Sequence, residues 1–66
     1  MDFANTLKAK WKVLRGKAKE QWGELTDDDL DRVDGQFEIL VGMLQDKYYL
    51  SRAKAEAEIN QFLADH

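Results

Sequence analysis

The chain lacks two residue types that shape many small proteins. It has no cysteine and no proline among its 66 residues, and only four glycines. Without cysteine there is no disulfide framework and no thiolate metal site, so stability must come from helix packing or self-association. The absence of proline and the abundance of good helix formers, such as alanine, leucine, lysine and glutamate, predict an all-α fold. We expect one small domain over residues 1–66, with a thin core.

Long apolar runs are also absent. No segment approaches the roughly 20 apolar residues of a membrane span. The N-terminal segment alternates charged and apolar residues, whereas a signal peptide has a continuous apolar region. We therefore expect a cytoplasmic protein.

Residues that carry enzyme chemistry are scarce. Ser51 is the only serine, the single histidine is the last residue, His66, and no glycine-rich phosphate loop occurs. A chain this short also offers little volume in which carboxylates can be buried and tuned. We therefore expect no enzymatic activity, no cofactor, no metal and no small-molecule substrate.

Apolar residues recur at helical spacing in four segments. The spacing predicts helices over residues 3–22, 27–34, 36–48 and 51–64. Val13 points away from the apolar stripe of the first helix, whereas Trp11 and Trp22 lie within it and are expected in the core. The residues expected to form the core are Phe3, Leu7, Trp11, Leu14, Ala18, Trp22, Leu30, Val33, Phe37, Leu40, Val41, Leu44, Tyr48, Ala55, Ile59, Phe62 and Leu63.

Glycines and one serine mark the expected helix boundaries. Gly23 is the expected left-handed residue at the end of the first helix, and Ser51 the expected cap of the last one. Asp34–Gly35 is a strong turn signal, although one long helix through it is the alternative; we favour the turn, because the chain must reverse to bury its stripes. Gly42 is expected to mark a close helix crossing, and Gly16 to bend the first helix or to admit another backbone.

The acidic run Thr26–Asp29 has two interpretations. As a helix start, the Thr26 hydroxyl accepts from the amide of Asp29, whose carboxylate returns the bond, while Leu25 and Leu30 form a hydrophobic staple. As a metal site, the spacing of Asp27, Asp29, Asp31 and Glu38 matches that of calcium ligands in an EF-hand loop. Arg32 stands where that loop needs glycine, and the apolar residues keep helical phase. We favour the helix start.

Charge is distributed unevenly along the chain. Residues 1–23 carry six basic and two acidic residues, whereas residues 24–66 carry four basic and eleven acidic ones. The first helix has a basic flank, which we define as Lys8, Lys12, Arg15 and Lys19. This flank is the candidate interaction face for nucleic acid or an anionic membrane. The alternative, favoured for an acidic protein, is a solvated flank whose lysines cover the tryptophans.

The sequence resembles the CsbD-like general stress-response proteins. The resemblance covers nearly the whole chain, through "WKVLRGKAKEQWGELTDDDL", "DGQF", "LVGMLQDKY" and an alanine- and glutamate-rich last helix. Its most specific residues are Gly16, Lys17, Lys19, Trp22, Gly23, Leu25, Thr26, Asp27, Asp28, Asp29, Gly35, Leu40, Gly42, Gln45 and Tyr48. One departure is Tyr49, where members commonly have glycine, so the third turn is expected to differ. Another is the beginning, "FANTLKAKW".

The resemblance implies a small bacterial cytoplasmic protein, induced by general stress, with two packed α-hairpins. It assigns no catalytic or ligand residue, because the shared positions are caps, turns and core. We therefore expect a non-enzymatic protein that acts through its surface, by binding an unknown protein partner or by self-association. An anionic-surface binder that uses the basic flank is the alternative.

Overall fold

The computed structural model describes residues 3–66, which form four α-helices and no strand. They are α1 (Phe3–Gln21), α2 (Asp27–Val33), α3 (Phe37–Tyr48) and α4 (Arg52–Asp65). The prediction of an all-α four-helix fold is confirmed. Each helix boundary lies within one residue of its predicted position, which is within the usual uncertainty of helix ends.

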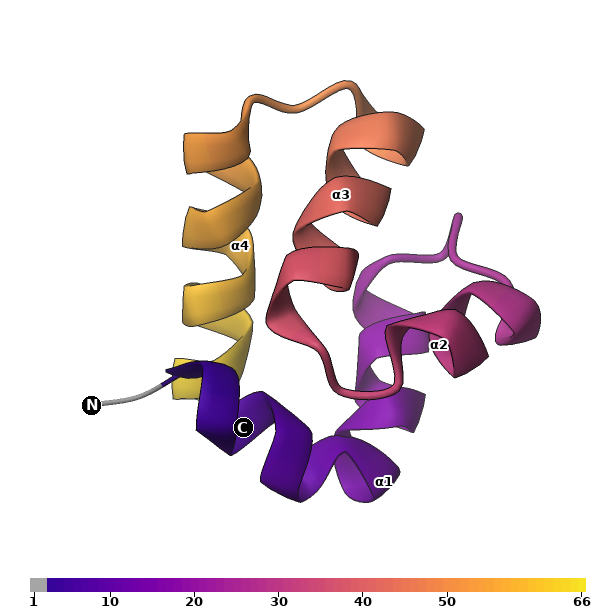
Figure 1. Cartoon of the computed structure of the whole chain (residues 1–66), viewed down its shortest axis with the longest axis vertical. Helices are drawn as coiled ribbons and strands as arrows, with labels where there is room; N and C mark the ends of the chain where they lie inside the picture. The colour runs from indigo at the N-terminus through magenta and orange to yellow at the C-terminus, as the bar shows by residue number, and fades with distance from the viewer. Residues whose placement is uncertain (1–2) are drawn as a thin grey trace.

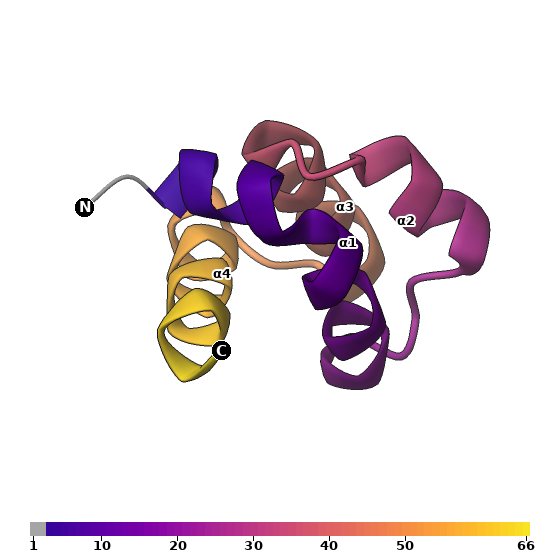
Figure 2. The same ribbon diagram turned by 90° about the horizontal axis from the view of Figure 1, so that it is seen from below.

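The four helices pack around one core. Figure 1 shows α3 and α4 side by side and antiparallel, joined by a short loop, with α1 across one end of the pair. The short α2 lies beside α3 and the later part of α1. Figures 1 and 2 both show α1 bent along its length, so that its apolar stripe follows the curve of the core. The most extensive helix contact is that between α3 and α4.

The predicted stripes supply the core. Trp11 and Trp22 are 7% and 2% exposed, whereas Val13 is 74% exposed, as the helical phase predicts. Phe3, Phe37 and Tyr48 are only partly buried and pack against the core from its edge. The buried apolar residues are Leu7, Trp11, Leu14, Ala18, Trp22, Leu25, Leu30, Val33, Leu40, Val41, Leu44, Ala55, Ile59, Phe62 and Leu63.

The first helix ends differently from the prediction. Gly23 does not adopt a left-handed conformation, since the only glycine with positive φ in residues 3–66 is Gly35. The chain leaves α1 through a turn in which the amide of Leu25 donates to the carbonyl of Trp22 at 3.0 Å. The buried Trp22 and Leu25 hold the two ends of this turn against the core. The interpretation of Gly23 as a left-handed cap was wrong.

The break at Asp34–Gly35 is confirmed. Asp34 ends α2 with φ 45° and ψ 39°, and Gly35 follows with φ 76°. A Cβ atom on Gly35 would lie 3.0 Å from both the Cα atom of Lys8 and the Cβ atom of Trp11. Only glycine allows both this left-handed conformation and this close approach of α1.

The expected close crossing at Gly42 was wrong. A Cβ atom on Gly42 would have no neighbour within 4 Å, and the same is true of Gly16. Gly42 lies on the exposed side of α3, where no other helix approaches. Gly16 is also exposed and therefore admits no other backbone; the bend of α1 agrees with the other expectation for it.

The connection between α3 and α4 is the segment Tyr49–Ser51. Tyr49 adopts the left-handed conformation, with φ 57° and ψ 38°, and its side chain is 92% exposed. The turn therefore has the backbone geometry that glycine usually supplies, although the residue is tyrosine. Ser51 caps α4 as predicted, because its hydroxyl accepts from the amide of Lys54 at 3.1 Å. No helix in residues 3–66 is long and apolar enough to cross a membrane.

Candidate functional site

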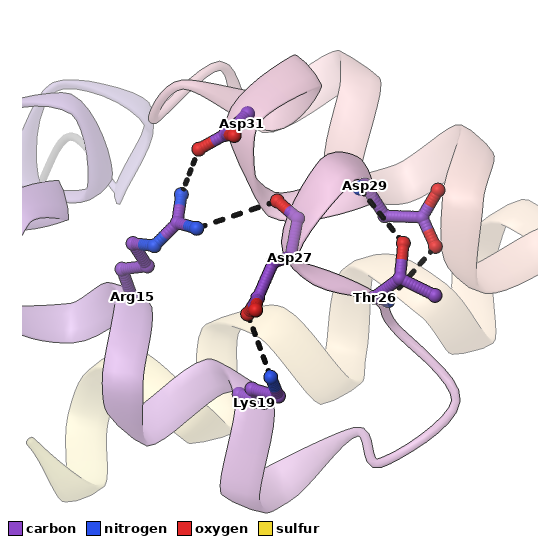
Figure 3. Close-up of polar contacts among 6 residues, drawn as sticks. All are labelled: Arg15, Lys19, Thr26, Asp27, Asp29 and Asp31. Carbon is purple, nitrogen blue, oxygen red and sulfur yellow. Dashed lines mark hydrogen bonds and ion pairs between the residues drawn. The ribbon is translucent and has the colours of Figure 1, made fainter.

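The basic flank of α1 faces the acidic side of α2. The Nζ atom of Lys19 lies 2.6 Å from a carboxylate oxygen of Asp27. Arg15 pairs with the Asp31 carboxylate and also donates to the carbonyl of Asp27 at 3.3 Å (Figure 3). The Nζ atom of Lys8 donates to the carbonyl oxygen of Asp34 at 3.0 Å and lies 3.5 Å from the Asp34 carboxylate. We call these contacts the α1–α2 ion-pair ladder.

The ladder shows how the two helices are oriented. Lys8, Arg15 and Lys19 meet partners whose order along the chain is reversed: Asp34, Asp31 and Asp27. The interacting segments therefore run antiparallel, as in the first of the two expected hairpins. The aspartate side chains are 67–70% exposed, so water screens each pair and its contribution to stability is small. The ladder fixes the register of α2 on α1 more than it stabilises the fold.

Lys12 is the member of the basic flank outside the ladder. It is exposed and forms no ion pair with any of residues 3–66. It lines an open cleft of about 400 Å³ between α1 and α2, together with Lys8, Arg15, Asp31 and Asp34. The cleft therefore combines three cations with two carboxylates, and only one of the cations lacks an internal anion.

The acidic run begins a helix, as favoured. Thr26 and Asp29 form a reciprocal capping box: the Thr26 hydroxyl accepts from the amide of Asp29 at 3.1 Å, and the Asp29 carboxylate accepts from the amide of Thr26 at 3.0 Å (Figure 3). Lys47 of α3 lies 2.5 Å from the same carboxylate, which is largely buried. These donors, Lys47 first, lower the pKa of Asp29 to about 2.

The four carboxylates with calcium-loop spacing have different partners. Asp27 bonds to Lys19, whose hydrogen bond and charge lower its pKa. Asp29 belongs to the capping box, Asp31 pairs with Arg15, and Glu38 accepts from Arg52 on α4. Within residues 3–66, no group of three or more acidic or histidine side chains is placed to hold a metal ion. The run caps α2 and supplies one ladder partner, Asp27.

The pairing between the basic flank and the aspartates of the α2 region was not predicted from the sequence, although a signal was present. Lys8, Arg15 and Lys19 are spaced by seven and four residues, and Asp27, Asp31 and Asp34 by four and three. Each set therefore occupies one side of its own helix. Opposite charges on two adjacent helices joined by a short turn predict such a ladder.

A family model matches most of the chain. The family model described as CsbD-like matches residues 5–57, which include most of α1, all of α2 and α3, and the start of α4. The chain belongs to the CsbD-like family.

Bacterial relatives extend this assignment. The CsbD-like chain is 52% identical over 59 residues to UPF0337 protein PA4738 of Pseudomonas aeruginosa. The matched region covers 89% of this chain and 91% of the relative. It is 49% identical over 61 residues to UPF0337 protein NE2439 of Nitrosomonas europaea, a match that covers 92% of this chain and 65% of that relative. It is 47% identical over 49 residues to UPF0337 protein YjbJ of Escherichia coli K12, a match that covers 74% of this chain and 71% of that relative. No solved structure gives a significant match.

Proposed function

We propose that this CsbD-like chain is a non-enzymatic cytoplasmic protein of the bacterial general stress response. In this proposal it acts through its surface, by binding another protein or further copies of itself. The stress role is what resemblance to the family implies. The charges of this chain support the mode of action.

The direction of its pKa shifts supports a non-enzymatic role. The pKa values of Asp27 and Asp29 are lowered by lysines, and the pKa of Arg52 is raised by Glu38. Each of these shifts moves the pKa of the group further from pH 7. A general acid or base, in contrast, works best with a pKa near the operating pH. These charges pair one helix with another or cap a helix, which supports a role for the outer surface.

An anionic surface, such as nucleic acid or a membrane, is the second candidate partner. The observation that favours it is Lys12, because this exposed cation has no ion-pair partner in residues 3–66 and lies in the same cleft as Lys8 and Arg15. An anion bound there would compete with Asp31 and Asp34 for those two side chains. This competition makes the anionic partner the weaker of the two candidates.

Two measurements test the proposal. Sedimentation velocity of the purified chain over a range of concentrations reports self-association. Affinity capture from stressed bacterial cells, followed by reconstitution with each purified candidate, reports a protein partner. We expect association that survives nuclease treatment and about 150 mM salt, where the Debye length is about 8 Å. A chain that stays monomeric and binds no purified candidate would refute the proposal.

A single substitution distinguishes the anionic alternative. Lys12→Gln removes the unpaired cation without touching the ladder, and Lys54→Gln is the matched control, since Lys54 is also exposed and forms no ion pair within residues 3–66. If the cleft binds phosphates, only Lys12→Gln weakens binding to duplex DNA or anionic vesicles and reduces its salt dependence. Equal effects of the two variants would exclude the cleft as the site.

A further inference from the structure

The hinge between α3 and α4 has an unusual conformation for its sequence. Tyr49 adopts φ 57°, a region that residues with a side chain rarely occupy, and its side chain is 92% exposed. No hydrogen bond, ion pair or ring contact of Tyr49 within residues 3–66 compensates for this strain. The other hinge residues, Leu50 and Ser51, are compatible with a helix. The strained conformation of Tyr49, the packing of Leu50 against the core and the Ser51 cap separate the two helices.

The apolar stripes of α3 and α4 are in phase across this hinge. Tyr48, the last residue of the stripe of α3, and Ala55, the first of α4, are seven residues apart, which is close to two helical turns. If the hinge became helical, a single helix from Phe37 to Asp65 would carry both stripes on one face, interrupted only by the exposed Ser51 and Arg52 between them. Its members would be Phe37, Leu40, Val41, Leu44, Tyr48, Ala55, Ile59, Phe62 and Leu63.

We propose that two copies of this chain exchange α4 by straightening the Tyr49–Ser51 hinge. In the exchanged dimer each α4 packs against α3 and α1 of the other copy, through the contacts that it makes within one copy here. This inference rests on the proposed self-association and names its partner, a second copy, and its route. Strained short hinges favour such exchange, because the exchanged and closed forms differ only at the hinge.

Three terms oppose the exchange at low concentration. Straightening the hinge removes the packing of partly buried Leu50 against the core and the hydrogen bond from the Lys54 amide to Ser51. Joining two chains also costs translational and rotational freedom. The exchange is therefore concentration-dependent, and it requires α4 to detach briefly. Partial unfolding followed by refolding at high protein concentration should populate the dimer.

Two hinge substitutions should shift the equilibrium in opposite directions. Tyr49→Gly relieves the strain of the closed form and weakens the continuous helix, so it should favour the monomer. Relief of the left-handed strain should change the equilibrium constant for dissociation about fivefold per hinge. Because the dimer contains two hinges, its dissociation constant should rise about 30-fold. Ser51→Ala removes a cap that only the closed form uses, so the dissociation constant should fall by a similar factor. A purely structural role of the hinge would not produce these opposite shifts in dimerisation.

The test combines refolding with cross-linking between chains. The wild type and the two hinge variants are refolded at about 1 mM, a concentration at which even weak dimers form, and examined by sedimentation velocity. In parallel, Glu38→Cys and Arg52→Cys chains are mixed, refolded together and treated with a short thiol cross-linker. Arg52 lies 2.6 Å from Glu38 in the closed form, so the two cysteines meet between chains only if α4 is exchanged. The same mixture without refolding is the control.

Each outcome has a definite meaning. Heterodimer cross-links that appear only after refolding, decrease with Tyr49→Gly and increase with Ser51→Ala support the exchange. Dimers that form without cross-links between the mixed chains overturn the exchange, while self-association through another surface still stands. If the wild type and Ser51→Ala both stay monomeric, the exchange is refuted, and the proposed function then depends on the protein partner measured separately by reconstitution.

Discussion

Gly35→Ala tests the close contact between α1 and the start of α3. The added Cβ atom would lie 3.0 Å from the Cα atom of Lys8, a backbone atom that cannot move without shifting α1. The substitution also places a side chain at φ 76°. The left-handed conformation costs about 1–2 kcal/mol and the overpacking about 1–3 kcal/mol, so we expect a loss of roughly 2–5 kcal/mol. This is a large part of the stability of a domain of this size, about 3–10 kcal/mol.

Gly42→Ala is the matched control, because it makes the same chemical change where no atom lies within 4 Å. Gly42 is exposed within α3, so alanine should raise the free energy of unfolding by about 0.5–1 kcal/mol through its higher helix propensity. Thermal unfolding followed by circular dichroism measures both effects. Gly35→Ala should lower the melting temperature by at least about 8 °C, since about 1 kcal/mol corresponds to 4–8 °C here. Equal and small changes for the two variants would refute the reasoning.

Three further predictions concern the core and the acidic run. Trp22→Ala should remove about 3–5 kcal/mol and leave the chain mostly unfolded by circular dichroism; a folded variant that lost only binding would place Trp22 outside the stabilising core. Thr26→Ala should cost about 1 kcal/mol through the lost cap, and added calcium should leave the wild-type melting temperature unchanged; a calcium-dependent rise would revive the metal interpretation. The pKa of Asp29 is about 2 in the folded chain and about 4 when unfolded, so its contribution to stability is complete above pH 4 and is lost as pH falls towards 2. Asp29→Asn should flatten the loss of stability over this interval, and an unchanged acid titration would show that Lys47 and Thr26 do not act on this carboxylate.

The features that local chemistry determines could be predicted from the sequence. Helix positions, the Thr26 capping box, the Ser51 cap and the Asp34–Gly35 break each depend on residues close together in the chain. The glycines were interpreted less well, because their roles depend on which elements approach them. Gly42 has helical neighbours in sequence but open space in the fold, whereas Gly35 meets α1 from more than twenty residues away.

The candidate interaction face shows the same division. The sequence placed Lys8, Lys12, Arg15 and Lys19 on one flank of a helix, and the structure agrees with that placement. Whether the flank binds a partner remains a prediction. Three of the four pair with aspartates in α2 or at its C-terminal end. This pairing depends on how the chain turns after Trp22, and the left-handed Gly23 expected in that turn did not occur.

The short connections between antiparallel helices have a consequence for how quickly the chain can recover from denaturation. The pairs α1–α2, α2–α3 and α3–α4 are neighbours both in sequence and in space, so little loop entropy is lost before they begin to pack. With no proline and no cysteine, refolding waits for neither peptide-bond isomerisation nor oxidation. At low concentration, refolding should therefore follow a single phase of micro- to milliseconds, without isomerase or oxidant. At low concentration, such a chain should regain its folded state within milliseconds after the denaturing condition ends.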